Sequence, residues 1–242
     1  MKSKILIIGD SCRDIFVYCD ASRLCPDVPV PVLNILNETE NSGMAKNVQR
    51  NIKSFIDCDI ITNDNWHQIT KTRYIHNDTN HMFIRVDTQH NINRINISEI
   101  DYDYDIIVIS DYNKGFLYEE DIKKICENHP CVFLDTKKIL GDWAKKAKFI
   151  KINNYEFENS KDFIDDELFN IIIRTKGSDG CFYKGKNYPV KKVQIKDTSG
   201  AGDSFMAALV VNYFKTNDIN KAINFANECA SKVVKEKGVT II

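Results

Sequence analysis

The segment DTSGAGDSF, residues 197–205, places two glycines and an acidic side chain directly before a long apolar run. Gly200 and Gly202 permit a tight turn and leave no Cβ atom to block an approaching ligand. If a helix begins near Gly202, its first unpaired N–H groups and the positive end of its dipole favour an anion such as phosphate. Asp203 is then placed to take a proton from a hydroxyl group while the N–H groups stabilise a transferring phosphoryl group.

The same segment also has a purely structural interpretation. Gly-Ala-Gly forms ordinary turns and Asp is a common helix N-cap, so Asp203 could serve only to cap the helix. Short glycine motifs often occur by chance, so the spacing alone leaves both interpretations open. A P-loop is excluded, because no Gly-Lys-Ser/Thr follows the glycines. For Asp197 we expect a role in bracing the turn or a place near a metal ion.

The elements that must position these residues follow an alternating pattern. Short apolar runs predict strands at 4–10, 59–62, 105–110, 131–136, 148–153 and 170–175, and apolar spacing predicts helices at 43–55, 119–128, 204–214 and 219–236. This alternation is typical of an α/β fold with a doubly wound, mainly parallel sheet and helices on both faces. Segments 29–37 and 81–89 alternate apolar with polar or proline positions, which predicts a separate small, half-exposed sheet of two or three strands.

Polar residues follow the predicted strands at their carboxyl ends, where doubly wound sheets bind ligands. They are Asp10, Asp14, Asp111, Lys114, Asp135, Lys137, Asn153 and Glu156. We therefore expect side chains that are scattered along the sequence to converge at one edge of the sheet.

Composition limits the classes of protein that fit. With 33 basic and 34 acidic residues and no long run of like charge, nucleic-acid binding is disfavoured. No apolar stretch approaches the roughly 20 residues of a membrane span, and the first ten residues do not form a secretory signal. The eight cysteines form no CxxC pair, which fits reduced, buried thiols in a cytoplasmic protein. We expect a single domain over residues 1–242.

The segment DTSGAGDSF resembles the C-terminal signature of the ribokinase-like, PfkB-type family of carbohydrate kinases. Within that family, several blocks are similar to the kinases that phosphorylate D-glycero-β-D-manno-heptose 7-phosphate at O1, on the way to ADP-heptose. In chain order the blocks are GDSCRD (9–14), SRLCPDVPVPVL (22–33), SGMAKNV (42–48), TKTRYI (70–75), IRVD (84–87), SDYNKG (110–115), NNYEFE (153–158) and FANECA (225–230). The resemblance runs nearly end to end and implies ATP-dependent transfer of the γ-phosphoryl group, with Mg²⁺.

The resemblance also implies a role for individual residues. It makes Asp203 the catalytic base and Gly200, Ala201 and Gly202 the anion hole. It implies substrate contacts from Asp10, Asp14, Gly43, Asn47, Lys71, Arg73, Arg85, Asp111 and Lys114, in which the cations hold the phosphate of the sugar. It implies nucleotide contacts from Asn153, Glu156, Thr175, Lys176, Gly177, Asp197 and Asn227, with Glu156 indirectly linked to the metal.

Each assignment has a simpler alternative. Exposed Lys and Arg side chains are usually solvated, and Arg85 could only pair with Asp87 or a neighbour. Asp10 and Asp14 could cap the following turn, and Asn227 could only hydrogen-bond a loop. For the whole protein, the alternatives are a kinase of another sugar or of a nucleoside, and a sugar or nucleotide sensor without catalysis.

The chain departs from the family pattern in three places. Ser42-Gly43 stands where the family usually has Gly-Gly, which bears on the identity of the sugar. A helix and a strand common in the family are missing after residue 62, and the stretch 158–170 is short. We also expect no nucleotidyltransferase domain, which sometimes follows this kinase. These features predict a trimmed sheet with a working site, and small-sheet strands at about 15–40 and 70–95 that form a homodimer.

Overall fold

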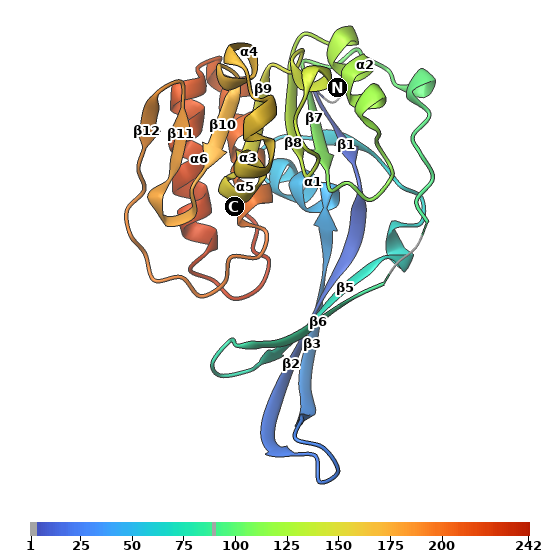
Figure 1. The fold of residues 1–242 in the computed structure, drawn as a ribbon, viewed down its shortest axis with the longest axis vertical. Coiled ribbons are helices and arrows are strands. Elements are labelled where there is room, and N and C mark those ends of the chain that lie inside the picture. The colour runs from blue at the N-terminus through green and yellow to red at the C-terminus, as the bar shows by residue number, and fades with distance from the viewer. Residues whose placement is uncertain (1–3, 89–90) are drawn as a thin grey trace.

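A central parallel sheet forms the body of the molecule in the computed structural model, which describes residues 4–88 and 91–242 (Figure 1). The strand order is β12-β11-β10-β9-β8-β7-β1-β4. The strands are β1 (Ile5–Gly9), β4 (Cys58–Thr62), β7 (Ile106–Asp111), β8 (Val132–Thr136), β9 (Phe149–Asn153), β10 (Ile172–Thr175), β11 (Cys181–Tyr183) and β12 (Lys186–Tyr188). All neighbours from β4 to β10 pair in parallel, and β11 and β12 add an antiparallel edge.

Helices cover both faces of this sheet, which explains why β1 and β7 are buried along their whole length. One apolar cluster contains residues of α1 (Ala45–Lys53), α5 (Ala201–Thr216) and α6 (Ile219–Val233). The opposite cluster contains residues of α2 (Glu119–Asn128), α3 (Asn154–Ser160) and α4 (Asp166–Phe169). Single 3-10 turns occur at η1 (Trp66–Gln68), η2 (Ile97–Glu99), η3 (Asp142–Ala144), η4 (Lys161–Phe163) and η5 (Gly177–Asp179). The predicted α/β sheet with helices on both faces is confirmed.

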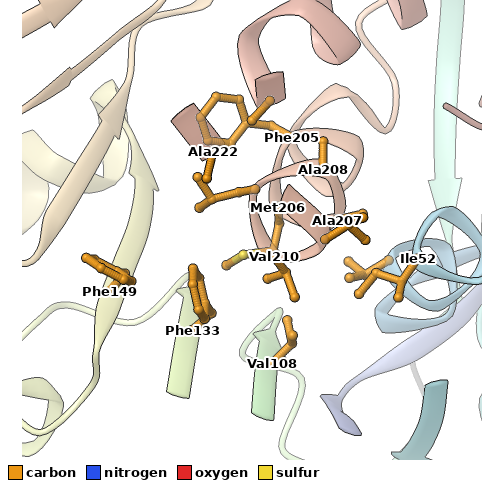
Figure 2. Packing of buried hydrophobic residues seen from close by; sticks show 14 of the residues in the cluster. Ile52, Val108, Phe133, Phe149, Phe205, Met206, Ala207, Ala208, Val210 and Ala222 are labelled. Carbon is orange, nitrogen blue, oxygen red and sulfur yellow. The ribbon is translucent and has the colours of Figure 1, made fainter. Parts of the chain in front are cut away.

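Helix α5 is apolar on nearly every face because sheet and helices enclose it. Met206 and Val210 lie toward the sheet residues Phe133 and Val108, while Ala222 of α6 lies on another side (Figure 2). The ring of Phe133 lies 5.2 Å from that of Phe149 and 5.3 Å from that of Tyr213, centroid to centroid. The helix that carries Asp203 at its start is therefore fixed by the core.

A second sheet, which we call the lid, projects away from the body (Figure 1). It has the order β3-β2-β5-β6, with strands β2 (Ser11–Leu24), β3 (Pro31–Met44), β5 (Thr70–His76) and β6 (Met82–Asp87). β2 and β5 pair in parallel, whereas β2 with β3 and β5 with β6 pair antiparallel. A single residue, Asp10, separates β1 from β2, so the lid is a direct continuation of the central sheet.

The lid differs from the prediction in two ways. It has four strands rather than two or three, and Asp14, expected in a loop after the first strand, lies within β2. The predicted small-sheet range of about 15–40 overlaps β2, but no separate strand was predicted there because polar side chains such as Arg13 and Asp20 interrupt its apolar pattern. The short strands β11 and β12 were also missed, since three residues show no periodicity. Residue 89, at the end of the predicted 81–89 strand, and residues 89–90 of the 70–95 range lie outside the described residues.

The segment after α1 is short, as expected. The chain passes from α1 through β4 and the η1 turn directly into β5 of the lid. Within residues 4–88 and 91–242, β4 forms the edge of the central sheet and pairs with β1 alone. The sheet is thus narrow on the side where the sequence lacks a helix and a strand.

Candidate active site

Asp203 is buried at the first turn of α5, with both carboxylate oxygens engaged. Asn47 Nδ2 donates to Asp203 Oδ2 at 2.8 Å, and the hydroxyl of Tyr112 donates to Asp203 Oδ1 at 2.6 Å. Burial raises the pKa of Asp203 above its usual value, and these two hydrogen bonds act in the opposite direction. The N-cap of α5 is Gly200, so the interpretation of Asp203 as a mere N-cap is wrong.

The backbone before Asp203 offers unpaired donors. The N–H of Ala201 bonds Thr198 O at 3.2 Å, whereas the N–H groups of Gly202 and Asp203 find no partner among the described residues. Gly200 has φ +76°, and a Cβ there would lie 3.0 Å from Asn47 Nδ2. A Cβ on Gly202 would lie 3.2 Å from Lys151 Nζ, which places this ammonium group against the turn. Two free N–H groups and a cation therefore converge here, as an anion requires.

A buried ionic network lies beside this turn. Lys151 Nζ donates to Asp135 Oδ2 at 2.6 Å, and Lys137 contacts both Asp135 Oδ1, at 3.5 Å, and Glu156. Burial opposes ionisation of Asp135, but the two lysines prevail and lower its pKa. Burial likewise opposes the charge of Lys137, but Asp135 and Glu156 raise its pKa. Sequence reasoning placed Asp135 and Lys137 at this edge but missed Lys151, whose signal was a lysine inside the apolar run KFIKIN.

Asn153 and Glu156 form a reciprocal capping box at the start of α3. Asn153 Oδ1 accepts the N–H of Glu156 at 2.9 Å, and Glu156 Oε2 accepts the N–H of Asn153 at 2.7 Å. The other oxygen of Glu156 contacts Lys137. No group of three or more His, Cys, Asp or Glu side chains suited to a metal ion occurs in the described part of the chain. These donors do not make a resident metal site, and the indirect link of Glu156 to a metal ion stays a prediction.

Asp10 and Asp111 hold the loop 112–116, which follows β7. The two carboxylate oxygens of Asp10 accept the N–H groups of Tyr112 at 2.7 Å and Phe116 at 3.3 Å. Burial raises the pKa of Asp10. Asp111 accepts the N–H of Asn113 at 2.9 Å and the hydroxyl of Thr136 at 2.6 Å. The structure thus gives both residues a role in shaping the loop, and their contact with a sugar stays a prediction.

The lid brings charged side chains toward the base. Asp14 and Arg73 form an ion pair, and Arg85 pairs with Asp87 on its own strand at 2.7 and 2.5 Å. Lys71 is 9% exposed, and its ammonium group lies 4.7 Å from the ring centroid of Tyr112. Lys71 has no ion pair or hydrogen bond to any residue that the structure describes, and burial lowers its pKa.

Three further residues from the substrate set have distinct surroundings. Asn47, expected on the sugar, bonds the base and is itself backed by Asn51, whose amide donates to Asn47 O at 2.8 Å. A Cβ on Gly43 would lie 2.8 Å from Cys12 Sγ, so the close packing of β2 and β3 requires this glycine. Lys114 is exposed in the loop that follows β7.

The residues expected on the nucleotide lie further along the carboxyl edge. Thr175 ends β10, and Lys176 and Gly177 begin the turn after it. Asp197 braces the glycine turn by accepting the N–H groups of Ser199 at 2.8 Å and Gly238 at 3.1 Å. Asn227 Nδ2 donates to the backbone oxygen of Tyr188 at 2.9 Å, so it bonds the last residue of β12 and not a loop. Their contacts with a nucleotide stay predictions.

Comparison with known proteins identifies the architecture. Residues 49–242 match the model of the pfkB family carbohydrate kinase. The bifunctional protein HldE of Campylobacter jejuni is 29% identical over 289 residues, covering 98% of this chain and 62% of the relative. Because that alignment is longer than the chain itself, the relative carries segments that this chain lacks. The chain therefore spans less than two thirds of this relative.

Solved structures share the fold at low sequence identity. The ribokinase of Thermotoga maritima has a TM-score of 0.75 at 18% identity, covering 98% of this chain and 95% of that one. The nucleoside kinase of Methanocaldococcus jannaschii has a TM-score of 0.73 at 19% identity, covering 98% and 93%. Across the described residues, no helix has both the length and the apolar character that crossing a bilayer requires.

Proposed function

The chain belongs to the pfkB family of carbohydrate kinases, and we propose that it transfers the γ-phosphoryl group of ATP to O1 of D-glycero-β-D-manno-heptose 7-phosphate. As a member of this family it is a phosphotransferase that acts on an alcohol group. The observation that carries the proposal is Asp203, a buried carboxylate one residue after a turn with unpaired N–H groups and a neighbouring lysine. This pairing of a base with an anion hole suits transfer of a phosphoryl group to a hydroxyl.

In the proposed reaction, Mg-ATP is a substrate whose phosphates lie along the glycine turn. Asp203 takes the proton of the attacking hydroxyl, the hydroxyl oxygen bonds the γ-phosphorus, and ADP leaves. The N–H groups of Gly202 and Asp203 and the ammonium group of Lys151 stabilise the charge on the transferring group. The raised pKa of Asp203 makes it a better proton acceptor than an exposed carboxylate.

Cationic side chains of the lid support the proposal that the acceptor sugar carries a phosphate. Lys71 is a nearly buried cation beside the ring that contacts the base, and no described carboxylate lies close enough to form an ion pair with it, although Asp14 and Asp203 interact with it at longer range. Leaving a charge desolvated and unpaired is costly, so a bound phosphate would relieve that cost. Arg73 and Arg85 lie opposite each other on β5 and β6 and extend the positive surface, although each already contacts a carboxylate. The heptose itself is supported by the sequence resemblance and by the HldE relative.

A panel of sugars and sugar phosphates in an ADP-release assay tests the acceptor. We expect activity with the heptose 7-phosphate and little with ribose, fructose or adenosine. Activity on one of these unphosphorylated compounds alone would refute the heptose 7-phosphate as the acceptor but would leave the assignment as a kinase intact. Binding of ATP and sugar without any ADP formation would favour a sensor.

The variant Asp203→Asn tests the base. Turnover should fall by about 100- to 10,000-fold, the usual contribution of a general base, while ATP binding measured by calorimetry stays close to that of the wild type. Asp162→Asn, an exposed position in the η4 turn, is the matched control and should keep full turnover. Near wild-type turnover of Asp203→Asn would refute the assignment of the base.

We also propose a homodimer through the lid. Ile84 and Val86 alternate along β6 with Arg85 and Asp87, so they lie on the face opposite these charged side chains. Exposed large apolar side chains gather on the lid and its connecting loop: Leu24, Val28, Val30, Ile35, Leu36, Met82, Ile84 and Val86. A four-stranded sheet with such a face needs cover, and a second copy of the same sheet supplies it by symmetry.

A further inference from the structure

Tyr112 occupies the position on Asp203 that an acceptor hydroxyl would need. Its hydroxyl donates to Asp203 Oδ1 at 2.6 Å, the usual distance between a hydroxyl and a carboxylate oxygen. Asn47 holds the other oxygen, and Asn51 supports Asn47 from within α1. A substrate hydroxyl that approaches Oδ1 from the same direction must therefore replace the hydroxyl of Tyr112.

The ring of Tyr112 is held by both the body and the lid. Asp10, between the two sheets, accepts the N–H of Tyr112 at 2.7 Å. The ring packs against a small apolar cluster of Cys12, Met44 and Ile69. On the polar side, the ammonium groups of Lys71 and Lys137 lie 4.7 and 5.3 Å from the ring centroid. These contacts fix the hydroxyl on the base more firmly than a mobile surface tyrosine could be fixed.

The hydroxyl of Tyr112 is a proton donor and a poor nucleophile in this setting. Burial and the negative charge of Asp203 raise the pKa of Tyr112 well above its usual value of 10.0. The phenol thus stays protonated at neutral pH. It can occupy the base without competing with the sugar as the group that receives phosphate.

We propose, on the basis of the kinase function above, that Tyr112 is a positioning residue that stands in for the acceptor hydroxyl until the sugar arrives. While ATP is bound alone, Tyr112 keeps water off Asp203. Without it, Asp203 would take a proton from water, the water oxygen would bond the γ-phosphorus, and ADP and phosphate would be released. The incoming sugar hydroxyl displaces the phenol and takes the same hydrogen bond.

The variant Tyr112→Phe tests this role, because it keeps the ring and removes the hydroxyl. ADP release without sugar should rise by about 100-fold, the lower end of general-base effects, while sugar-dependent turnover persists. In the wild type the hydrogen bond from Tyr112 lowers the pKa of Asp203, so its removal should raise that pKa. The acid limb of the kcat/KM profile should therefore move to higher pH. Tyr118→Phe, an exposed tyrosine just before α2, should leave both measurements unchanged.

A second variant separates occupancy of the base from a change in its pKa. Asn47→Ala also removes a donor to Asp203, so it should shift the acid limb in the same direction. In this proposal Oδ1 is the oxygen that takes the proton. Asn47→Ala frees only Oδ2 and leaves Tyr112 on Oδ1, so ADP release without sugar should stay low. Equal increases in both variants, or no increase in Tyr112→Phe, would overturn the role of Tyr112 while the kinase function stands. Absence of sugar-dependent ADP release in the wild type across the acceptor panel would instead overturn the kinase function and the inference with it.

Discussion

The body and the lid hold their functional side chains by different means. In the body, every residue of β1 and β7 is buried, and the base sits on a helix enclosed by apolar side chains. In the lid, β6 has no buried residue, and its charged side chains Arg85 and Asp87 are placed by pairing with each other. Close packing in the core restricts the movement of a side chain in every direction, whereas an exposed ion pair restricts it only weakly. We infer that the chemistry is built into the rigid part and the choice of acceptor into the adaptable part.

The largest expected effect contrasts one isoleucine from each region. Ile107 in β7 is 0% exposed and Ile84 in β6 is 53% exposed. Ile107→Ala should lower the free energy of unfolding by about 2–5 kcal/mol, because it leaves a cavity in the core. Ile84→Ala should change it by about 0.5 kcal/mol or less. Urea denaturation measures the free energy of unfolding of both variants, and a second protein concentration shows how much of it depends on self-association. Equal decreases in the two variants would contradict the contrast between body and lid.

The next effect concerns the acceptor. Lys71→Met should raise KM for the phosphorylated sugar by about 10- to 100-fold, since a charge-assisted hydrogen bond contributes about 1.5–3 kcal/mol. The KM for ATP should hardly change, because Lys71 belongs to the lid. Steady-state kinetics in both substrates measures this, with the exposed Lys123→Met on α2 as control. A rise in KM for ATP of the same size would show that Lys71 serves the nucleotide.

The smallest effect concerns assembly. Val86→Lys puts a charge on the apolar face of the lid and should weaken self-association by about tenfold, while the unfolding of the monomer stays nearly unchanged. Sedimentation of wild type and variant over a dilution series gives the two dissociation constants. Val28→Lys, in the loop that joins β2 and β3, tests whether the interface reaches the far end of the lid. A wild type that stays monomeric at micromolar concentration would refute the dimer.

The same contrast explains what the sequence could predict. Buried parallel strands such as β7 are unbroken apolar runs, and the glycine turn before Asp203 is local in sequence, so both were recognised from short segments. β2 was covered only by the broad small-sheet range 15–40 and its bounds were not predicted, because a strand exposed in part and charged in part follows no simple period.

Residues that act through contacts distant in sequence were also missed. Tyr112 stands in the block SDYNKG, but its bond to a carboxylate 91 positions away follows only from the fold. Lys151 reads as a lysine in a strand until the sheet brings it against Gly202. The sequence resemblance assigned Asn47 to the sugar, and the fold shows in addition that Asn47 hydrogen-bonds the base Asp203.

The passage from β1 into β2 through Asp10 has a mechanical consequence. The fourteen residues of β2 extend for about 45 Å at roughly 3.3 Å per residue, without a linker at their root. We infer that a ribbon joined to the body in this way moves by bending along its length, most easily at the register shifts between Tyr18 and Cys19 and between Asp20 and Arg23, and not by swinging on a linker. Asp10, at the start of this ribbon, accepts the N–H of Tyr112, whose hydroxyl contacts Asp203. A displacement at the far end of the lid would therefore be transmitted to the catalytic carboxylate.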